Sequence, residues 1–83
     1  MKYVNAKQLE GKKVIVSDGS ALGKLIDIDV DEITGKILHL FVEPDPDSQL
    51  ATKLEKEEGL LKIPYSSVDA VGDYIIVNRK NLG

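Results

Sequence analysis

Residues 18–43 read DGSALGKLIDIDVDEITGKILHLFVE, and this stretch decides the fold. It begins with an Asp-Gly turn, alternates aliphatic with carboxylate side chains, turns again at Gly35 and then alternates once more. Successive side chains of a β-strand point to opposite faces, so an alternating pattern indicates a half-buried strand. Residues 24–31 and 36–43 are therefore predicted to form an antiparallel hairpin.

The register of this hairpin follows from the rule that directly opposed residues share a face of the sheet. A two-residue loop at 34–35 would set leucines against carboxylates. A three-residue loop at 33–35, closed by Gly35 in a type I turn with a G1 bulge, avoids this conflict. It predicts the pairs Val30–Leu38, Ile28–Leu40 and Ile26–Val42. A slip of one residue would turn every side chain of one strand to the wrong face.

The rest of the chain adds short elements of the same kind. Further strands are predicted at 13–18, 60–65 and 73–78, and a helical turn at 5–10. The segment Pro44-Asp45-Pro46 cannot belong to a central strand, because proline has no N–H to donate. Residues 49–58 are either a helix, capped by Asp47 or Ser48 and ended by Gly59, or a disordered loop. The pattern predicts an all-β fold, a small closed or nearly closed barrel of short strands.

Composition limits both the architecture and the partners. The 83 residues make one domain, residues 1–83, in which 46–59 form a variable loop or short helix. Cysteine is absent, and no apolar run is long enough to span a bilayer or to form a signal peptide, so a cytoplasmic protein without membrane insertion is expected. The net charge is −3 and the basic residues are scattered, which makes a nucleic-acid partner unlikely.

No catalytic, metal or cofactor residue is predicted. The carboxylates between Asp27 and Glu32 do not fit a calcium loop, because its sixth position, a glycine, is Glu32 here and its twelfth, a glutamate, is Leu38. Gly19 and Gly23 do not fit a phosphate loop, because only three residues separate them and a strand follows. The single histidine, His39, is predicted to face Asp29 across the hairpin, with no nucleophile beside it.

The outward face of the predicted strands carries more apolar side chains than solvation requires. They are either covered by the helical turn, the 49–58 segment or barrel curvature, or they form an exposed patch that binds protein. On the second interpretation, the residues predicted to contact a partner or a second copy are Leu25, Ile37, His39, Phe41 and Ile75.

The ordered set of these motifs resembles the PRC-barrel domain family, most closely its short stand-alone archaeal members. The resemblance covers nearly the whole chain except 44–59. It rests on Leu9-x-Gly11-Lys12-x-Val14, Asp18-Gly19-x-x-Leu22-Gly23-Lys24, Ile26-Asp27-Ile28-Asp29-x-Asp31-x-x-Thr34-Gly35-x-Ile37 and Ile63-Pro64-Tyr65-Ser66-x-Val68-x-x-Val71-Gly72-Asp73-Tyr74-Ile75-Ile76-Val77.

This resemblance implies a small PRC-type β-barrel of about six strands, without catalytic activity, that docks onto other proteins. It implies an adaptor in archaeal cell division with a SepF-type protein as the partner. A homodimer is expected as well, because burial of the apolar patch between two copies would supplement the small core. The pattern defines the barrel and assigns no functional residue. The alternative is an accessory factor of RNA processing or ribosome assembly, which would bind RNA through Lys12, Lys13, Arg79 and Lys80.

Overall fold

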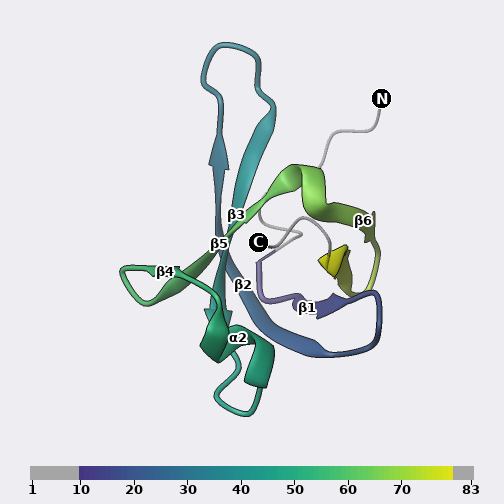
Figure 1. Cartoon of the computed structure of the whole chain (residues 1–83). Coiled ribbons are helices and arrows are strands. Elements are labelled where there is room, and N and C mark those ends of the chain that lie inside the picture. Colours follow the sequence, from purple (N-terminus) through teal and green to yellow (C-terminus); the bar gives the residue numbers. More distant parts are fainter. Residues whose placement is uncertain (1–9, 80–83) are drawn as a thin grey trace.

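The computed structural model describes residues 10–79, which fold into a single seven-stranded sheet with one short helix (Figure 1). The predicted helical turn at 5–10 lies almost wholly outside the described residues. The helix is α2 (Gln49–Lys53), and a 3-10 turn, η1 (Tyr65–Ser67), follows β5. The strands are β1 (Lys13–Val16), β2 (Ala21–Val30), β3 (Ile37–Pro44), β4 (Lys56–Glu57), β5 (Leu60–Pro64), β6 (Val68–Val71) and β7 (Ile75–Val77).

The strand order is β4-β5-β3-β2-β1-β7-β6, and β1 and β7 run parallel. The all-β prediction is confirmed. The strand count differs from the predicted six, because β4 and β6 lie in segments that were interpreted as a helix and a connection. The sheet is also not closed, since β4 and β6 remain its two ends.

One row of apolar side chains crosses the centre of the sheet. Leu40 of β3 lies opposite Ile28 of β2 on one side and Ile63 of β5 on the other. Leu40 and Ile63 are each 1% exposed, and Ile28 packs against them. The fully buried core also includes Val14, Val16, Leu22, Leu25, Val42, Ala51, Leu61, Ile75 and Val77.

The predicted hairpin register holds only in its middle. Ile28 pairs with Leu40 as predicted, and Asp29 pairs with His39. Bulges on either side of this segment change the pairing, so that Leu25 rather than Ile26 faces Val42. An extra residue in one strand reverses which side chains point inward. As a result, Ile26 is 38% exposed and Leu25 only 1%, the reverse of the prediction.

A second bulge produces a similar change near the turn. Val30 pairs with Ile37 instead of Leu38, and Leu38 is 43% exposed. The loop therefore has four residues, 32–35, rather than three. Asp31 N–H donates to the Lys36 carbonyl at 2.8 Å, and Gly35 N–H donates to the Asp31 carbonyl at 2.8 Å. Gly35 has a φ of 74°, which agrees with its predicted left-handed conformation.

Pro44 was predicted to lie outside any central strand, but it is the last residue of β3 and pairs with Gly23, a strand end at which the missing N–H interrupts no further pairing. The region after β3 forms a helix that is shorter than the predicted one. The Ser48 hydroxyl accepts a hydrogen bond from Ala51 N–H at 3.1 Å and caps α2. The helix ends at Lys53 because Lys56 and Glu57 pair with β5 as β4. Glu58 and Gly59, both with positive φ, form the two-residue turn between these strands.

Candidate functional site

The β2–β3 hairpin extends beyond the other strands and forms the most prominent projection of the described residues (Figure 1). Here residues 27–39, which span the end of β2, the loop and the start of β3, are called the hairpin arm. The arm carries three exposed aliphatic side chains: Val30 at 39%, Ile33 at 95% and Leu38 at 43%. Aliphatic surface of this kind on a small domain marks a contact site for another molecule.

The hairpin arm is also acidic. The arm carries four carboxylates (Asp27, Asp29, Asp31 and Glu32) against one lysine, Lys36. The arm therefore holds a net charge equal to that of the whole chain, −3. A surface with an apolar tip and an acidic surround selects partners that carry the opposite charge.

Local hydrogen bonds fix the shape of the arm's loop. The Asp31 carboxylate accepts from Ile33 N–H at 2.8 Å and from Thr34 N–H at 3.3 Å. These two backbone bonds, with a weaker contribution from the Thr34 hydroxyl, hold the pKa of Asp31 below its ordinary value. Asp31 therefore orders the loop that presents Ile33 to solvent.

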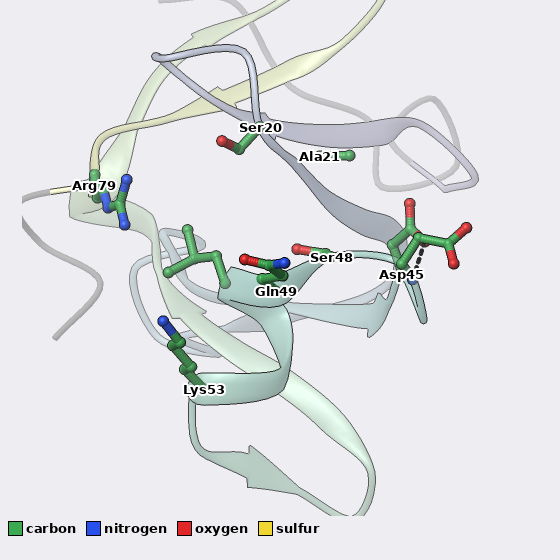
Figure 2. A pocket seen from close by; sticks show the side chains of 9 residues that line it. Ser20, Ala21, Asp45, Ser48, Gln49, Lys53 and Arg79 are labelled. Atoms are coloured by element: carbon green, nitrogen blue, oxygen red, sulfur yellow. Dashed lines mark hydrogen bonds between the residues drawn. The ribbon is translucent and has the colours of Figure 1, made fainter.

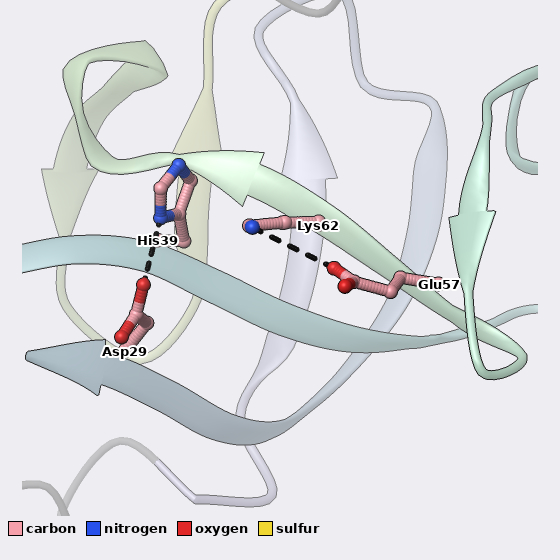
Figure 3. Close-up of polar contacts among 4 residues, drawn as sticks. All are labelled: Asp29, His39, Glu57 and Lys62. Carbon is pink, nitrogen blue, oxygen red and sulfur yellow. Dashed lines mark hydrogen bonds and ion pairs between the residues drawn. The ribbon is translucent and has the colours of Figure 1, made fainter.

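At the base of the arm, two predicted contact residues lie on the outward face of β3. His39 Nδ1 lies 3.0 Å from Asp29 Oδ2 (Figure 3). Phe41 pairs with Asp27 of β2 on one side and with Lys62 of β5 on the other. Lys62 in turn lies 3.6 Å from Glu57 of β4. His39 and Phe41 are half-buried, so each keeps part of its side chain available for a contact.

The remaining three predicted contact residues have different positions. Ile37 is half-buried and packs against the core at the start of the arm. Leu25 and Ile75 are each 1% exposed, so their assignment to a contact surface is wrong. Leu25 turns inward because of the bulge at Ile26, and Ile75 turns inward because it pairs with the buried Val14 of the parallel neighbour β1.

A polar groove of about 460 Å³ lies on the other side of the molecule, between the β1–β2 turn and α2 (Figure 2). Arg79 and Lys53 line one part of it and Asp45 and Asp47 another. Ser48, which also lines it, is engaged as the helix cap. No histidine lines the groove.

Arg79 is held at this groove by an ion pair. Its guanidinium lies 3.1 Å from the Asp18 carboxylate. Hydrogen bonds from Ser20 lower the pKa of Asp18, and Arg79 lowers it further. Within the described part of the chain, no group of three His, Cys, Asp or Glu residues is arranged to hold a metal ion.

The residues of the predicted RNA-binding set do not form one patch. The Lys12 amine donates to the Gly72 carbonyl, beside the start of β7, whereas Arg79 lies beyond the end of that strand. Lys13 is exposed beside Lys12, and Lys80 is outside the described residues. Two separated groups do not make the continuous basic stripe that tracks a phosphate backbone.

Comparison with known proteins identifies the class. The PRC-barrel domain profile matches residues 1–82. The chain is also 36% identical over 83 residues to Uncharacterized protein MJ1118 of the archaeon Methanocaldococcus jannaschii, covering 99% of this chain and 89% of that protein. The chain therefore belongs to the PRC-barrel domain family, as its sequence motifs indicated. The PRC barrel is in general a small non-catalytic domain, and such domains commonly mediate protein interactions.

The exposed Ile33 was not among the predicted contact residues, although the sequence carried a signal for it. Ile33 occupies a predicted turn, where polar residues and glycine are usual, and an aliphatic side chain there has no core to enter. The exposure of Val30 and Leu38 had no such signal, because it depends on the bulges.

Within residues 10–79 there is no helix long and apolar enough to cross a membrane.

Proposed function

We propose that this protein is a non-catalytic binding module that uses the hairpin arm to dock onto another protein. The observation that carries the proposal is the exposure of Ile33, 95%, at the tip of an ordered projecting loop. Burying a side chain of this size in a partner's pocket contributes about 1.5–3 kcal/mol. His39 and Phe41, at the base of the arm, and Ile37 extend the proposed contact surface.

The charge of the arm supports a protein partner over a nucleic acid. The four carboxylates of the arm repel phosphate, whereas they attract a protein pocket whose rim carries lysine or arginine. Such a rim would raise the association rate at low salt, and the apolar centre would set the dissociation rate.

The family resemblance suggests the biological setting. We propose a SepF-type protein of archaeal cell division as the partner, with the chain acting as a cytoplasmic adaptor that also associates with itself. The archaeal source of the similar protein agrees with this setting, although that relative is itself uncharacterised.

The test is a binding measurement between the purified chain and the SepF-type protein encoded in the same genome. The double substitution Ile33→Asp with Leu38→Asp is expected to weaken binding at least tenfold, as the loss of about 1.5–3 kcal/mol implies. Phe41→Asp is expected to weaken binding without unfolding the domain, because Phe41 lies on the outward face. Biolayer interferometry gives the affinities, and far-UV circular dichroism checks the fold.

Ile26→Asp is the matched control. Ile26 is an exposed isoleucine, as Ile33 is, at 38%, but it lies in β2 before the arm begins. It is expected to bind like the wild type. If the arm variants bind as tightly as the wild type, or if Ile26→Asp weakens binding equally, the arm is not the docking surface.

A further inference from the structure

The face of β1 and β7 that points away from the core carries apolar side chains. Successive residues of a strand point to opposite faces, so the residue between two buried ones in β1, and likewise in β7, lies on the outer face. Each of these residues is paired with an alanine of the next strand. The resulting row is here called the outer strip, and it consists, in order across four strands, of Ala70, Ile76, Ile15 and Ala21. The isoleucines are half-buried and the alanines are exposed.

Two lysines border the outer strip. Lys13 and Lys24 are exposed and lie directly opposite each other in the β1–β2 ladder. Opposed like charges destabilise a strand pair. Glu43 pairs with Lys24 on its other side, but no ion pair among residues 10–79 includes either lysine. The two ammonium groups are therefore available to carboxylates of another molecule.

Tyr74 continues the row of lysines onto β7. Val14 pairs with Ile75 in the parallel β1–β7 ladder, and Lys13 and Tyr74 are the residues directly before this pair, so they are neighbours as well. The side chain of Tyr74 is exposed, with 50% of its residue surface open to solvent. Tyrosine is enriched at protein interfaces because its ring is apolar and its hydroxyl is polar. Lys13, Lys24, Tyr74 and the outer strip are together called the outer patch.

The hairpin arm is complementary to the outer patch in both polarity and charge. Its tip presents Ile33, which is 95% exposed. Glu32, the residue before it, is also exposed and belongs to none of the ion pairs within the described part of the chain. An apolar side chain next to a carboxylate matches an apolar strip next to lysines. The arm projects away from β1 and β6 (Figure 1), so its tip does not reach the patch of its own chain.

We infer that the arm tip of one copy docks onto the outer patch of a second copy, with Ile33 on the outer strip and the Glu32 carboxylate beside Lys13. This inference extends the proposed function, from which it takes the arm as a docking surface. Because arm and patch are different surfaces, the contact is heterologous. A second copy and the division partner use the same arm, so self-association and partner binding exclude each other at any one arm.

The first test reverses the two charges. Glu32→Lys sets a lysine against Lys13, and Lys13→Glu sets a glutamate against Glu32. In sedimentation equilibrium, each variant is expected to associate about tenfold more weakly than the wild type. The chain with both substitutions regains opposite charges and is expected to associate within about threefold of the wild type. Lys13→Glu also removes the opposed lysine pair, so its Tm is expected not to fall.

Matched controls are Lys53→Glu and Glu55→Lys, which make the same charge changes at exposed positions outside both surfaces. Both are expected to associate like the wild type. A wild type that is monomeric at high micromolar concentration contradicts the inference. So does a single reversal at position 13 or 32 without effect, or a double variant that associates no better than the single ones.

The second test shows that the contact joins unlike surfaces. Ile33→Asp keeps the patch but lacks the apolar tip, whereas Lys13→Glu keeps the arm but lacks the patch lysine. Each protein alone is expected to be largely monomeric. Their equimolar mixture is expected to form a one-to-one complex, because it contains one intact arm and one intact patch. A mixture that stays as monomeric as its components excludes an arm–patch contact.

The two proposals fail separately. Lys13→Glu lies outside the arm and is expected to bind the division protein at least as tightly as the wild type. If the wild type is monomeric but the Ile33→Asp, Leu38→Asp variant loses the division partner, the contact between copies is wrong and the proposed function stands. If charge reversal and rescue occur but the arm variants bind the division protein normally, the inference holds and the proposed function does not.

Discussion

Replacing Gly23 with alanine is expected to destabilise this small domain strongly, because the backbone of β3 leaves no room for a Cβ at this position of β2. A Cβ at position 23 would lie 1.9 Å from the Glu43 carbonyl oxygen and 2.9 Å from Val42 Cγ1. Relief of this overlap requires the two strands to separate by about 1 Å, since non-bonded carbon–oxygen contacts much below 3 Å do not occur.

The loss of unfolding free energy can be estimated from the hydrogen bonds that join β2 and β3 near Gly23. Asp45 N–H, just beyond β3, donates to the Leu22 carbonyl of β2 at 2.9 Å, and Gly23 and Lys24 pair with Pro44 and Glu43 in the same part of the ladder. A separation of about 1 Å takes such bonds out of hydrogen-bonding range, at about 0.5–1.5 kcal/mol each. Overpacking adds about 1–3 kcal/mol. The expected loss of unfolding free energy is about 3 kcal/mol or more, out of about 4–12 kcal/mol for a domain of this size.

Urea denaturation followed by far-UV circular dichroism measures this loss, and a thermal scan is expected to show Tm lowered by more than about 12 °C. Gly72→Ala is the control. It has no atom within 4 Å of the added Cβ and no positive φ, so a change between neutral and about 1 kcal/mol of stabilisation is expected. If Gly23→Ala lowers the unfolding free energy by less than about 1 kcal/mol, a Cβ at position 23 does not force β2 and β3 apart, and the reasoning is refuted.

Three further perturbations test other parts of the fold. Glu58→Asn is expected to raise the unfolding free energy by about 0.5–1 kcal/mol in a urea titration, because Glu58 holds a φ of 52° that asparagine tolerates better; an unchanged midpoint contradicts this. Asp31→Ala is expected to lower Tm at neutral pH and to reduce its fall in acid. The folded pKa of Asp31 is lowered, so its contribution to stability is present above its unfolded pKa and is lost as pH falls through the folded value; parallel Tm–pH curves for variant and wild type would refute this. Leu40→Ala is expected to cost about 2–5 kcal/mol by opening a cavity beside Ile28 and Ile63, and a loss below about 1 kcal/mol would show that the row is not packed as described.

The alternating pattern of residues 24–31 and 36–43 was sufficient to predict the hairpin and the left-handed Gly35, since both depend on local backbone geometry. The pairing of Ile28 with Leu40 was also predictable, because both faces of the strands were clearly marked there. The Ser48 cap was one of two candidates that the sequence left open. These successes share a cause, which is that neighbouring residues supply all the information needed.

The contact surface was predicted less well for a physical reason. Periodicity assumes an unbroken strand, and a single bulge at Ile26 moved Leu25 into the core and turned Ile26 to solvent. Similarly, nothing local marks Ile75 as buried, because its partner is Val14, far away in the sequence. His39 and Phe41 kept their predicted outward positions because they lie between the two bulges.

By itself, the sequence determined the all-β class, the hairpin and its central register, because these follow from the local alternation of side chains. The ordered motifs of the sequence also indicated the family to which the chain belongs. Only the tertiary structure decided that the sheet stays open, that β6 is an edge and that the aliphatic tip of the arm reaches solvent. Strand order and bulges arise from contacts between distant segments, and a one-residue change in pairing is sufficient to exchange the inner and outer faces of a strand.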